Sequence, residues 1–372
     1  MKRRAKLLTK KLALSAAALA TVLLVIEVAF RLLGVSGEFH QSRVDVVYRH
    51  PDAPREVLAH GFQPHSFIRS QYDSDPRGYF GPDKTIYHRF NSVGWRDGEH
   101  VTAKSPGTYR ILGLGDSYLY GQGVRHENIC LTRLQVLLSK TFRNVTIETI
   151  NTGLSGANTA FQAELLRHRG LDYDPDLVIV HFVLNDVEKS LEALKQRGPR
   201  VEFVGNYLSI YDKPDVLSKY SNLWAWARQR YLRQVHGRAY LNQCLESFQQ
   251  DSSKWAQCGR ALSDIQRICQ EHGARMLVVI FPFFVNLDED YPFQPIHDVV
   301  RRFCESSGID VIDLRDHYRD YNGPELWVHP TDQHPNEIAH GIAADTIADY
   351  ITARPEHFRL PTAGAGHHDG PE

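Results

Sequence analysis

The chain has 372 residues, 42% of them hydrophobic, and can therefore bury one large core or two smaller ones. Its 43 Lys and Arg residues balance its 44 Asp and Glu residues, which argues against a nucleic-acid partner, because such proteins carry a basic excess or stripe. The sequence contains no evident internal repeat.

The N-terminus combines a basic start with a long apolar run. Lys and Arg fill much of positions 2–11, and an apolar run of 22 residues follows, from Leu12 to Leu33. As a helix this run spans about 33 Å, enough to cross a bilayer. The basic residues then place the N-terminus in the cytoplasm and the chain after residue 35 in the periplasm or extracellular space. Glu27 and Arg31 are four residues apart, so we expect them to pair on one helix face.

A cleaved signal peptide is the alternative interpretation of this segment, and it too exports the rest of the chain. The apolar run is long and ends without an evident small-x-small cleavage site, which favours an uncleaved signal anchor. We therefore predict a single-pass membrane protein in which residues 1–35 form a basic cytoplasmic stub and a transmembrane helix.

Residues 36–108 are rich in Pro, Gly, His, Arg and aromatic residues and show little periodicity. Two motifs punctuate them, Asp75-Pro76-Arg77-Gly78-Tyr79-Phe80 and Asn91-Ser92-Val93-Gly94-Trp95-Arg96-Asp97. The aromatic content is too high for a disordered linker. We predict an irregular N-terminal extension with short strands that packs on the main domain.

From Tyr109 onward, short apolar runs alternate with helical patterns. The predicted strands are residues 109–114, 145–151, 176–183, 275–281 and 309–313. The predicted helices are residues 128–141, 157–169, 261–272, 296–307 and 336–352. Strands such as 177–180 are continuously apolar, as expected when both faces of a sheet are covered. The alternation predicts an α/β domain over residues 109–353, with a parallel sheet and right-handed crossovers.

Residues 187–260 interrupt this alternation between the third and fourth strands, and we predict a helical insertion there. Insertions of this length beside a strand end often form a lid. Trp224 and Trp226 within it are expected in the core rather than as a platform for a sugar. Residues 354–372, rich in Pro, Gly, Ala and His, are predicted to be a disordered tail.

The chain has five cysteines, and none shows the spacing of a CxxC pair or of a metal site. They are Cys130, Cys244, Cys258, Cys269 and Cys304. An exported location permits disulfides, and we expect Cys244 and Cys258, close together in a polar stretch, to be joined. The alternative is that all five are buried thiols.

Four polar turns belong to one edge of the predicted sheet. Gly115-Asp116-Ser117 follows the first strand, Gly153 follows the second and Asn185-Asp186 follows the third. The fourth turn, Asp332-Gln333-His334-Pro335-Asn336, precedes the last helix. The carboxyl ends of parallel strands share an edge, so these turns can converge although they are far apart in sequence.

The side chains of these turns supply what acyl transfer requires, which is a hydroxyl nucleophile, a base and an acid that orients the base. Ser117, His334 and Asp332 have those chemical types, as nucleophile, general acid/base and orienting acid. The reaction also needs hydrogen-bond donors for the developing oxyanion. We predict that the backbone N–H groups of Ser117 and Gly153 and the side-chain amide of Asn185 form this oxyanion hole.

These four blocks, in this order, resemble the SGNH (GDSL-type) hydrolase superfamily over about residues 109–352. Glu27 and Arg31 in a single N-terminal helix, followed by the motifs at 75–80 and 91–97, are similar to its membrane-anchored bacterial branch. The resemblance implies a flavodoxin-like, three-layer α/β/α fold with a five-stranded parallel sheet in the order 2-1-3-4-5. It also implies esterase or acyl-transfer chemistry that uses no cofactor.

Two features depart from the usual pattern of the family. Tyr118 follows the serine where the family usually has Leu, at a position that packs rather than reacts. The family usually spaces its acid and histidine as Asp-x-x-His, whereas Asp332 and His334 are two residues apart and Thr331 stands in the usual place of the acid. Some anchored and polysaccharide-modifying relatives share the shorter spacing, and we keep Asp332 as the orienting acid.

Three functions are compatible with this site. The first is a serine esterase that hydrolyses carboxylic esters through an acyl-enzyme on Ser117. The second is an O-acetyltransferase or deacetylase of an envelope polysaccharide, so the substrate is an ester or an acetylated glycan. The third is a catalytically silent binding module on the same fold, in which Ser117 and Asn185 only brace turns or cap helices.

A metal site is a weaker interpretation of the histidines near the C-terminus. His329, Asp332, His334 and His340 lack the i, i+4 helical pair found in motifs such as His-Glu-x-x-His. The sequence therefore predicts no metal.

Overall fold

A computed structural model describes residues 2–35, 43–47, 62–188, 215–288, 290–330 and 332–361. These residues belong to two compact units. The larger unit is drawn from Ser42–Phe203 and Leu241–Glu372, and the smaller from Met1–Gln41 and Val204–Tyr240. All of the predicted site residues belong to the larger unit.

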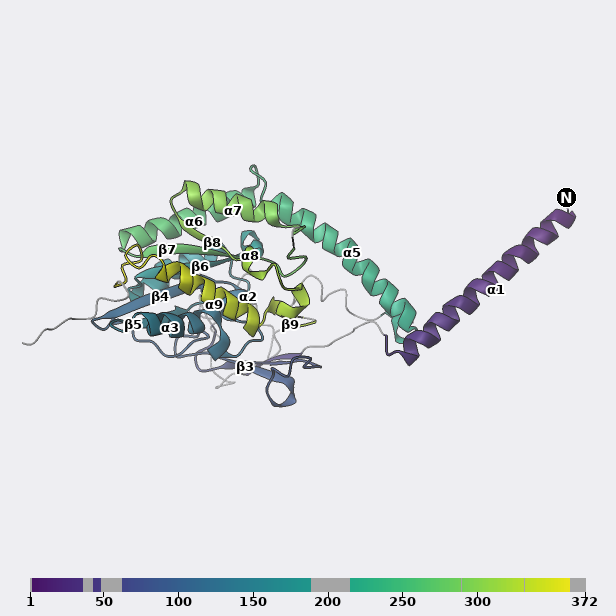
Figure 1. Ribbon diagram of the computed structural model, residues 1–372, viewed down its shortest axis with the longest axis horizontal. Helices are drawn as coiled ribbons and strands as arrows, with labels where there is room; N and C mark the ends of the chain where they lie inside the picture. Colours follow the sequence, from purple (N-terminus) through teal and green to yellow (C-terminus); the bar gives the residue numbers. More distant parts are fainter. Residues whose placement is uncertain are drawn as a thin grey trace, which may run out of the picture. The chain divides into compact units, whose positions relative to one another are not determined.

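Five parallel strands form the main sheet of the larger unit (Figure 1). They are β4 (Thr108–Gly115), β5 (Thr146–Asn151), β6 (Leu177–Val183), β7 (Arg275–Phe281) and β8 (Asp310–Asp313). Their order across the sheet is β5-β4-β6-β7-β8, and each neighbouring pair is parallel. Counted along the chain from β4, this order is 2-1-3-4-5, so the predicted flavodoxin-like fold is confirmed.

Helices cover both faces of this sheet (Figure 1). They are α3 (Cys130–Thr141), α4 (Thr159–Leu165), α6 (Ser253–Glu271), α7 (Gln294–Ser306) and α9 (Glu337–Thr352). α3 packs against α9 on one side of the sheet, and α6 lies on the other side. α4 packs against α6. The rings of Trp255 on α6 and Phe303 on α7 meet edge to face at 5.5 Å, which joins α7 to the second layer. Because connections between parallel strands are nearly always right-handed, a strand order that runs both ways from β4 places helices on both faces.

The centre of the sheet is apolar and leaves little space above β4. All of β6 is buried, as is β4 from Tyr109 onward. A Cβ on Gly113 would lie 2.7 Å from the Leu131 side chain, and one on Gly115 would lie 2.7 Å from the Cβ of Leu119. Leu119 therefore packs directly on the end of β4, and this close approach draws the turn after the strand onto the sheet.

A small antiparallel sheet lies within the predicted N-terminal extension. It contains β1 (Arg43–Val47), β2 (Phe67–Gln71) and β3 (Thr85–Arg89), in the order β1-β2-β3. Tyr72 and Phe80 stack at 4.4 Å and share a buried cluster with Val124 and Val328. The extension is thus more regular than expected, while the proposed domain boundaries stay predictions.

The chain ends differ in part from expectation. The predicted disordered tail starts too early, because Phe358 and Leu360 are buried and the Phe358 carbonyl accepts a hydrogen bond of 2.7 Å from the Tyr109 hydroxyl. The rest of that tail, 362–372, lies outside the described residues, as does the stretch 189–214 of the predicted insertion.

The smaller unit contains the helix α1 (Lys2–Leu32) and the first part of α5 (Asn222–Ser247). Within α1, Thr9–Leu32 has a mean hydropathy of 2.3 and is long enough to cross a membrane. Arg31 Nε lies 2.7 Å from Glu27 Oε1, so the expected pair is formed. Trp224 is 44% exposed, so its predicted place in the core is wrong.

The predicted disulfide between Cys244 and Cys258 is also wrong. All five cysteines are buried thiols. Cys258 faces the Thr159 hydroxyl, with 3.3 Å between Sγ and Oγ1, and Cys130 and Cys304 lie in the helix layers with no exposed surface. The second interpretation of the cysteines, as apolar core residues, is the one that the structure supports.

Candidate active site

Ser117 stands where β4 ends and the short helix α2 (Ser117–Tyr120) begins. The preceding Asp116 caps this helix, and its carboxylate accepts the Tyr118 N–H at 2.8 Å. The nucleophile candidate is thus fixed at the carboxyl edge of the sheet, where ligands bind in open α/β folds.

The structure brings His334 and Asp332 to Ser117. The distance from His334 Nε2 to Ser117 Oγ is 2.9 Å, and that from His334 Nδ1 to Asp332 Oδ1 is 2.5 Å. The carboxylate of Asp332 can only accept, so Nδ1 carries the ring proton and Nε2 is left to accept the serine hydroxyl. This is the arrangement that a general base needs.

The two-residue spacing of acid and histidine has a simple structural basis. Asp332 and His334 lie on β10 (Asp332–Pro335), which pairs with β9 (Trp327–His329) in a short antiparallel hairpin with an irregular register. Side chains two residues apart on a strand share a face. The following Asn336 caps α9 and donates to the carbonyls of Glu325 and Trp327, which ties the hairpin to the helix.

His334 and Asp332 each stabilise the charged form of the other. Burial disfavours the imidazolium, but the carboxylate of Asp332, with a smaller effect of Asp116, outweighs burial and raises the pKa of His334 above its usual value near 6.5. Burial likewise favours the neutral form of Asp332, but His334 and the hydrogen bond from Tyr72 lower the pKa of this carboxyl. The ion pair is therefore the stable state of the site when His334 is protonated.

Tyr72 is a member of the site that the sequence did not reveal. Its hydroxyl donates to Asp332 Oδ2 at 2.8 Å, and the side chain is 3% exposed. Tyr72 follows β2, far from the four motif blocks, and only its closeness to the motif at 75–80 could have drawn notice. Each carboxylate oxygen of Asp332 thus has its own partner, His334 on one and Tyr72 on the other.

The predicted oxyanion donors lie beside the same turn. A Cβ on Gly153 would lie 2.4 Å from the Tyr120 backbone nitrogen, so only glycine fits against α2. Its N–H donates to Asn151 Oδ1 at 2.9 Å. Asn185 Nδ2 donates to Asp116 Oδ2 at 3.1 Å, and an amide nitrogen has a second N–H.

Two buried carboxyls flank this region. Burial raises the pKa of Asp116 above its usual value, although hydrogen bonds from Tyr118 and Asn185 oppose the rise. Burial and the charge of Asp116 raise the pKa of Asp186 well above its usual value. Asp186 is held by the Val183 N–H at 3.3 Å. Asp116 and Asp186 therefore each hold the backbone of the turn that carries them.

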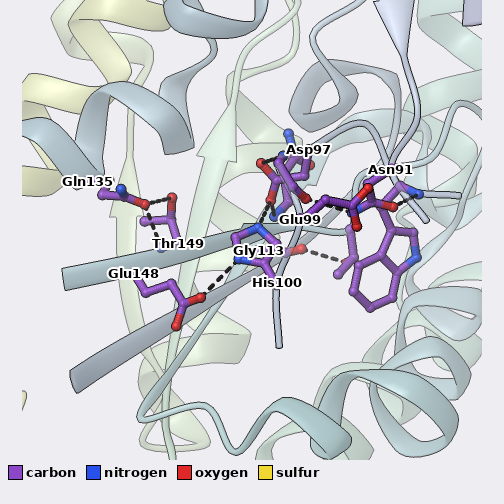
Figure 2. Close-up of polar contacts among 12 residues, drawn as sticks. Asn91, Asp97, Glu99, His100, Gly113, Gln135, Glu148 and Thr149 are labelled. Carbon is purple, nitrogen blue, oxygen red and sulfur yellow. Dashed lines mark hydrogen bonds and ion pairs between the residues drawn. The ribbon is translucent and has the colours of Figure 1, made fainter. Parts of the chain in front are cut away.

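The motif at 91–97 supports the turn after β5. Asp97 accepts the Asn151 N–H at 2.6 Å, and Asn151 in turn donates to the Leu119 carbonyl at 3.1 Å. Figure 2 shows His100 between Asp97 and Glu148, at 2.9 Å and 3.0 Å. This chain of contacts links the N-terminal extension to the strand end that carries Gly153.

Arg96 of the same motif holds the segment after Ser117. It is buried, and its guanidinium donates to the carbonyls of Tyr120, Gly121 and Val124. The planar guanidinium group carries five N–H donors in a fixed geometry, which lets it bind several carbonyls at once. The segment 91–97 therefore fixes both α2 and the turn after β5.

The other histidines near the C-terminus have separate structural partners. His329 contacts the Ser74 hydroxyl at 2.7 Å, and His340 Nδ1 accepts the Cys130 N–H at 3.1 Å. Within the described ranges, the side chains of His, Cys, Asp and Glu form no group of three that could hold a metal ion.

A comparison with protein families finds one model, described as the GDSL-like Lipase/Acylhydrolase family, that matches residues 114–342. None of the curated proteins compared with the chain matches it.

Among solved structures, the chain is similar to a two-domain esterase (CEX) active on acetylated mannans, with 14% identity, a TM-score of 0.42, and coverage of 71% of this chain and 53% of that chain. The chain thus spans about half the length of that esterase. TesA matches with 13% identity, a TM-score of 0.42, and coverage of 66% and 98%. A catalytic mutant of Axe2, an acetylxylan esterase from Geobacillus stearothermophilus, matches with 15% identity, a TM-score of 0.41, and coverage of 68% and 96%.

Proposed function

Because the chain belongs to the GDSL-like Lipase/Acylhydrolase family, we propose that it hydrolyses ester bonds and that Ser117, His334 and Asp332 are its catalytic triad. The contact of 2.9 Å between His334 Nε2 and Ser117 Oγ, with Asp332 on the other ring nitrogen, is the observation that carries this proposal. The substrate class is carboxylic esters.

The proposed reaction has two halves. His334 Nε2 takes the hydroxyl proton while Ser117 Oγ attacks the ester carbonyl, and Asp332 stabilises the imidazolium that forms. His334 then gives the proton to the leaving alcohol, and an acyl-enzyme remains on Ser117. Water, deprotonated by His334, attacks this acyl group and releases the carboxylic acid and the free serine.

The oxyanion is stabilised by N–H groups around Ser117. We assign this role to the backbone N–H groups of Ser117 and Gly153 and to the side-chain amide of Asn185. The Gly153 N–H already donates to Asn151 Oδ1, so its proposed bond to the oxyanion would be a three-centre bond. One such donor contributes about 3 kcal/mol to the stabilisation of the transition state.

Replacement of the nucleophile tests the proposal. Ser117→Ala should lower the hydrolysis of p-nitrophenyl acetate by on the order of 10⁶-fold. A fluorophosphonate probe should label the wild-type protein at Ser117, as read by peptide mass spectrometry, and not the variant. Wild-type rates in the variant would refute the triad, and an unlabelled wild-type protein would favour a silent binding module.

We also propose that the apolar segment Thr9–Leu32 anchors the chain in a membrane, with the catalytic domain in the periplasm or extracellular space. Its length and hydropathy support an anchor, and the basic residues before it support a cytoplasmic N-terminus. Protease protection of the larger unit in intact spheroplasts would count against this orientation.

The predicted anchor favours a second candidate, an O-acetyltransferase or deacetylase of an envelope polysaccharide. Both reactions use the same acyl-enzyme and differ in the acceptor, which is a glycan hydroxyl in one and water in the other. Mass spectrometry of glycans incubated with the protein and an acetyl donor distinguishes them. Loss of acetyl groups without any gain would exclude the transferase.

A further inference from the structure

The first part of α5 carries a row of exposed aromatic and apolar side chains. Trp224 is 44% exposed, Tyr231 64% and Val235 41%. These residues are seven and four positions apart, so they lie on one face of the helix. Tyr220, just before the helix, is 73% exposed. We call these four residues the α5 stripe.

The apolar helix α1 holds the start of α5, within the same compact unit. The Glu27 carboxylate accepts hydrogen bonds from the backbone N–H groups of Asn222 at 3.1 Å and Leu223 at 3.0 Å, and from the Ser221 hydroxyl at 2.8 Å. A carboxylate satisfies the free N–H groups of a helix N-terminus and suits the helix dipole.

Two further contacts strengthen this junction. Arg31 donates to the Tyr220 carbonyl at 2.5 Å, and the rings of Phe30 and Trp226 meet edge to face at 5.6 Å. Glu27 thus carries out two tasks, since it pairs with Arg31 and caps α5. The last turns of the apolar segment and the first turn of α5 form one local structure.

The depth of this junction in a bilayer follows from the helix rise. Glu27 lies five residues before Leu32, the end of the apolar segment, which is about 8 Å along a helix. That level belongs to the boundary between headgroups and acyl chains, where Trp and Tyr are enriched in membrane proteins. The α5 stripe therefore begins at the membrane interface.

We propose that the α5 stripe is a membrane-contact surface, which lies on the bilayer that α1 crosses. Tyr220, Trp224, Tyr231 and Val235 enter the headgroup boundary, and the exposed Arg230 and Arg238 beside them face lipid phosphates. Helices that lie in the interface carry aromatic side chains together with Lys and Arg. Basic residues also favour anionic lipids.

This inference rests on the proposed anchor and adds a second membrane contact to it. A second copy of the chain or a soluble partner could also cover an apolar stripe. The bilayer is favoured because the stripe continues from a segment that is itself long and apolar enough to enter lipid.

Nitroxide labels in the full-length protein test the proposal. The protein is placed in nanodiscs of phosphatidylethanolamine and phosphatidylglycerol, with one added cysteine per variant, Trp224→Cys, Tyr231→Cys or Val235→Cys. The five native thiols are buried and stay in place. Collision of the label with oxygen reports lipid, and collision with a nickel chelate reports water.

Three control positions make the result interpretable. Gly237→Cys lies on α5 about 120° around the helix from Tyr231, where a Cβ would meet nothing within 4 Å. Val101→Cys, 68% exposed, represents a position in water, and Leu19→Cys within α1 reports the anchor. Hydrolysis of p-nitrophenyl acetate by each labelled variant shows that its larger unit is folded.

We expect the ratio of oxygen to nickel collisions to be severalfold higher at the stripe positions than at Gly237 and Val101, and to approach the ratio at Leu19. Stripe labels as accessible to nickel as Val101, with Leu19 in lipid, would overturn the proposal and leave the anchor intact. Dipolar broadening between stripe labels would assign the surface to a second copy. A water-exposed Leu19 would remove the anchor and the inference together.

Discussion

Ser117 and His334 are 217 residues apart in sequence. Their contact depends on two single residues that fix the backbone near each of them. Asp116 fixes the start of α2 through the Tyr118 N–H, and Asn336 ties β10 to α9. The residue types of the triad could be predicted because acyl transfer needs them. The partner on the far side of Asp332, Tyr72, could not, since a single tyrosine after a strand carries no pattern.

Tyr72 is expected to tune the acid of the triad. Tyr72→Phe removes the donor to Asp332 Oδ2 and keeps the buried ring, so we expect kcat/KM for p-nitrophenyl acetate to fall about tenfold, which corresponds to about 1.4 kcal/mol. Without this donor Asp332 attracts the imidazolium more strongly, so the acid limb of the pH profile should move to higher pH.

Tyr79→Phe is the matched control for Tyr72. The Tyr79 hydroxyl accepts the Arg125 N–H at 2.8 Å. Its loss should leave the pH profile unchanged. An unchanged pH profile in both variants, with a similar loss of rate, would show that Tyr72 serves only the fold.

The raised pKa of His334 predicts a pH dependence. His334 must be neutral to take the proton of Ser117, and Asp332 holds its pKa above 6.5. The rate of ester hydrolysis should therefore fall as the pH drops through a value above 6.5. Asp332→Asn removes the main cause of the raised His334 pKa. The fall in rate should therefore occur at lower pH in this variant, while kcat falls by roughly 10⁴-fold. A limb at or below pH 6.5 in the wild type would contradict the ion pair.

At the scale of elements, the main sheet was predictable and the hairpin was not. The central strands β4, β6 and β7 are apolar runs buried on both faces, which is the strongest pattern in a sequence. β10 reads Asp-Gln-His-Pro, with no apolar alternation and a proline, and so has no strand signal. Tertiary contacts form this hairpin, and it places the Asp332 carboxylate beside the His334 ring at the short Asp-x-His spacing.

The tight contact between Gly153 and α2 yields a prediction about these elements. In Gly153→Ala the new Cβ would lie 2.4 Å from the Tyr120 nitrogen, so the turn after β5 must move away from α2. We expect the free energy of unfolding to drop by about 1–3 kcal/mol, as for overpacked cores, together with a loss of hydrolysis.

Gly98→Ala serves as the control for Gly153→Ala. A Cβ on Gly98 meets nothing within 4 Å. This variant should therefore keep the wild-type free energy of unfolding, measured in urea, and the wild-type rate of ester hydrolysis. A Gly153→Ala protein that matched Gly98→Ala in both measurements would show that the turn and α2 are not tightly packed.

For the whole molecule, the N-terminal extension and the α/β domain behave as one structure around the site. Asp97, Arg96 and Tyr72 belong to the extension, and each contacts an element that carries or supports the triad. Aromatic richness predicted that this segment packs, but which strand ends it would hold depends on long-range contacts that no local pattern encodes. The extension is therefore part of the candidate site.

Stability should depend on pH through His100. Burial lowers its pKa, but Asp97 and Glu148 outweigh burial and raise it above 6.5 (Figure 2). The stabilisation that protonated His100 gives the folded protein is fully present below the pKa of His100 in the unfolded chain. It is lost as the pH rises through the higher pKa of His100 in the folded protein. The difference in free energy of unfolding between wild type and His100→Gln should thus shrink as the pH rises above 6.5.

Urea unfolding of both proteins at several pH values measures this difference. His168→Gln is a suitable control, because His168 is exposed and its imidazole pairs with the exposed side chain of Glu164 on the same helical stretch. A difference that grows with pH would mean that His100 is neutral in the folded protein.

The burial of all five cysteines has a consequence for biogenesis. In an oxidising compartment the native chain hides its sulfur atoms from oxidants, whereas a nascent or unfolded chain presents five thiols that can cross-link in wrong pairs. In the proposed orientation, with the catalytic domain outside the cytoplasm, folding speed competes with oxidation during export. Variants that fold slowly would be trapped as mispaired species, even where their finished structure is stable.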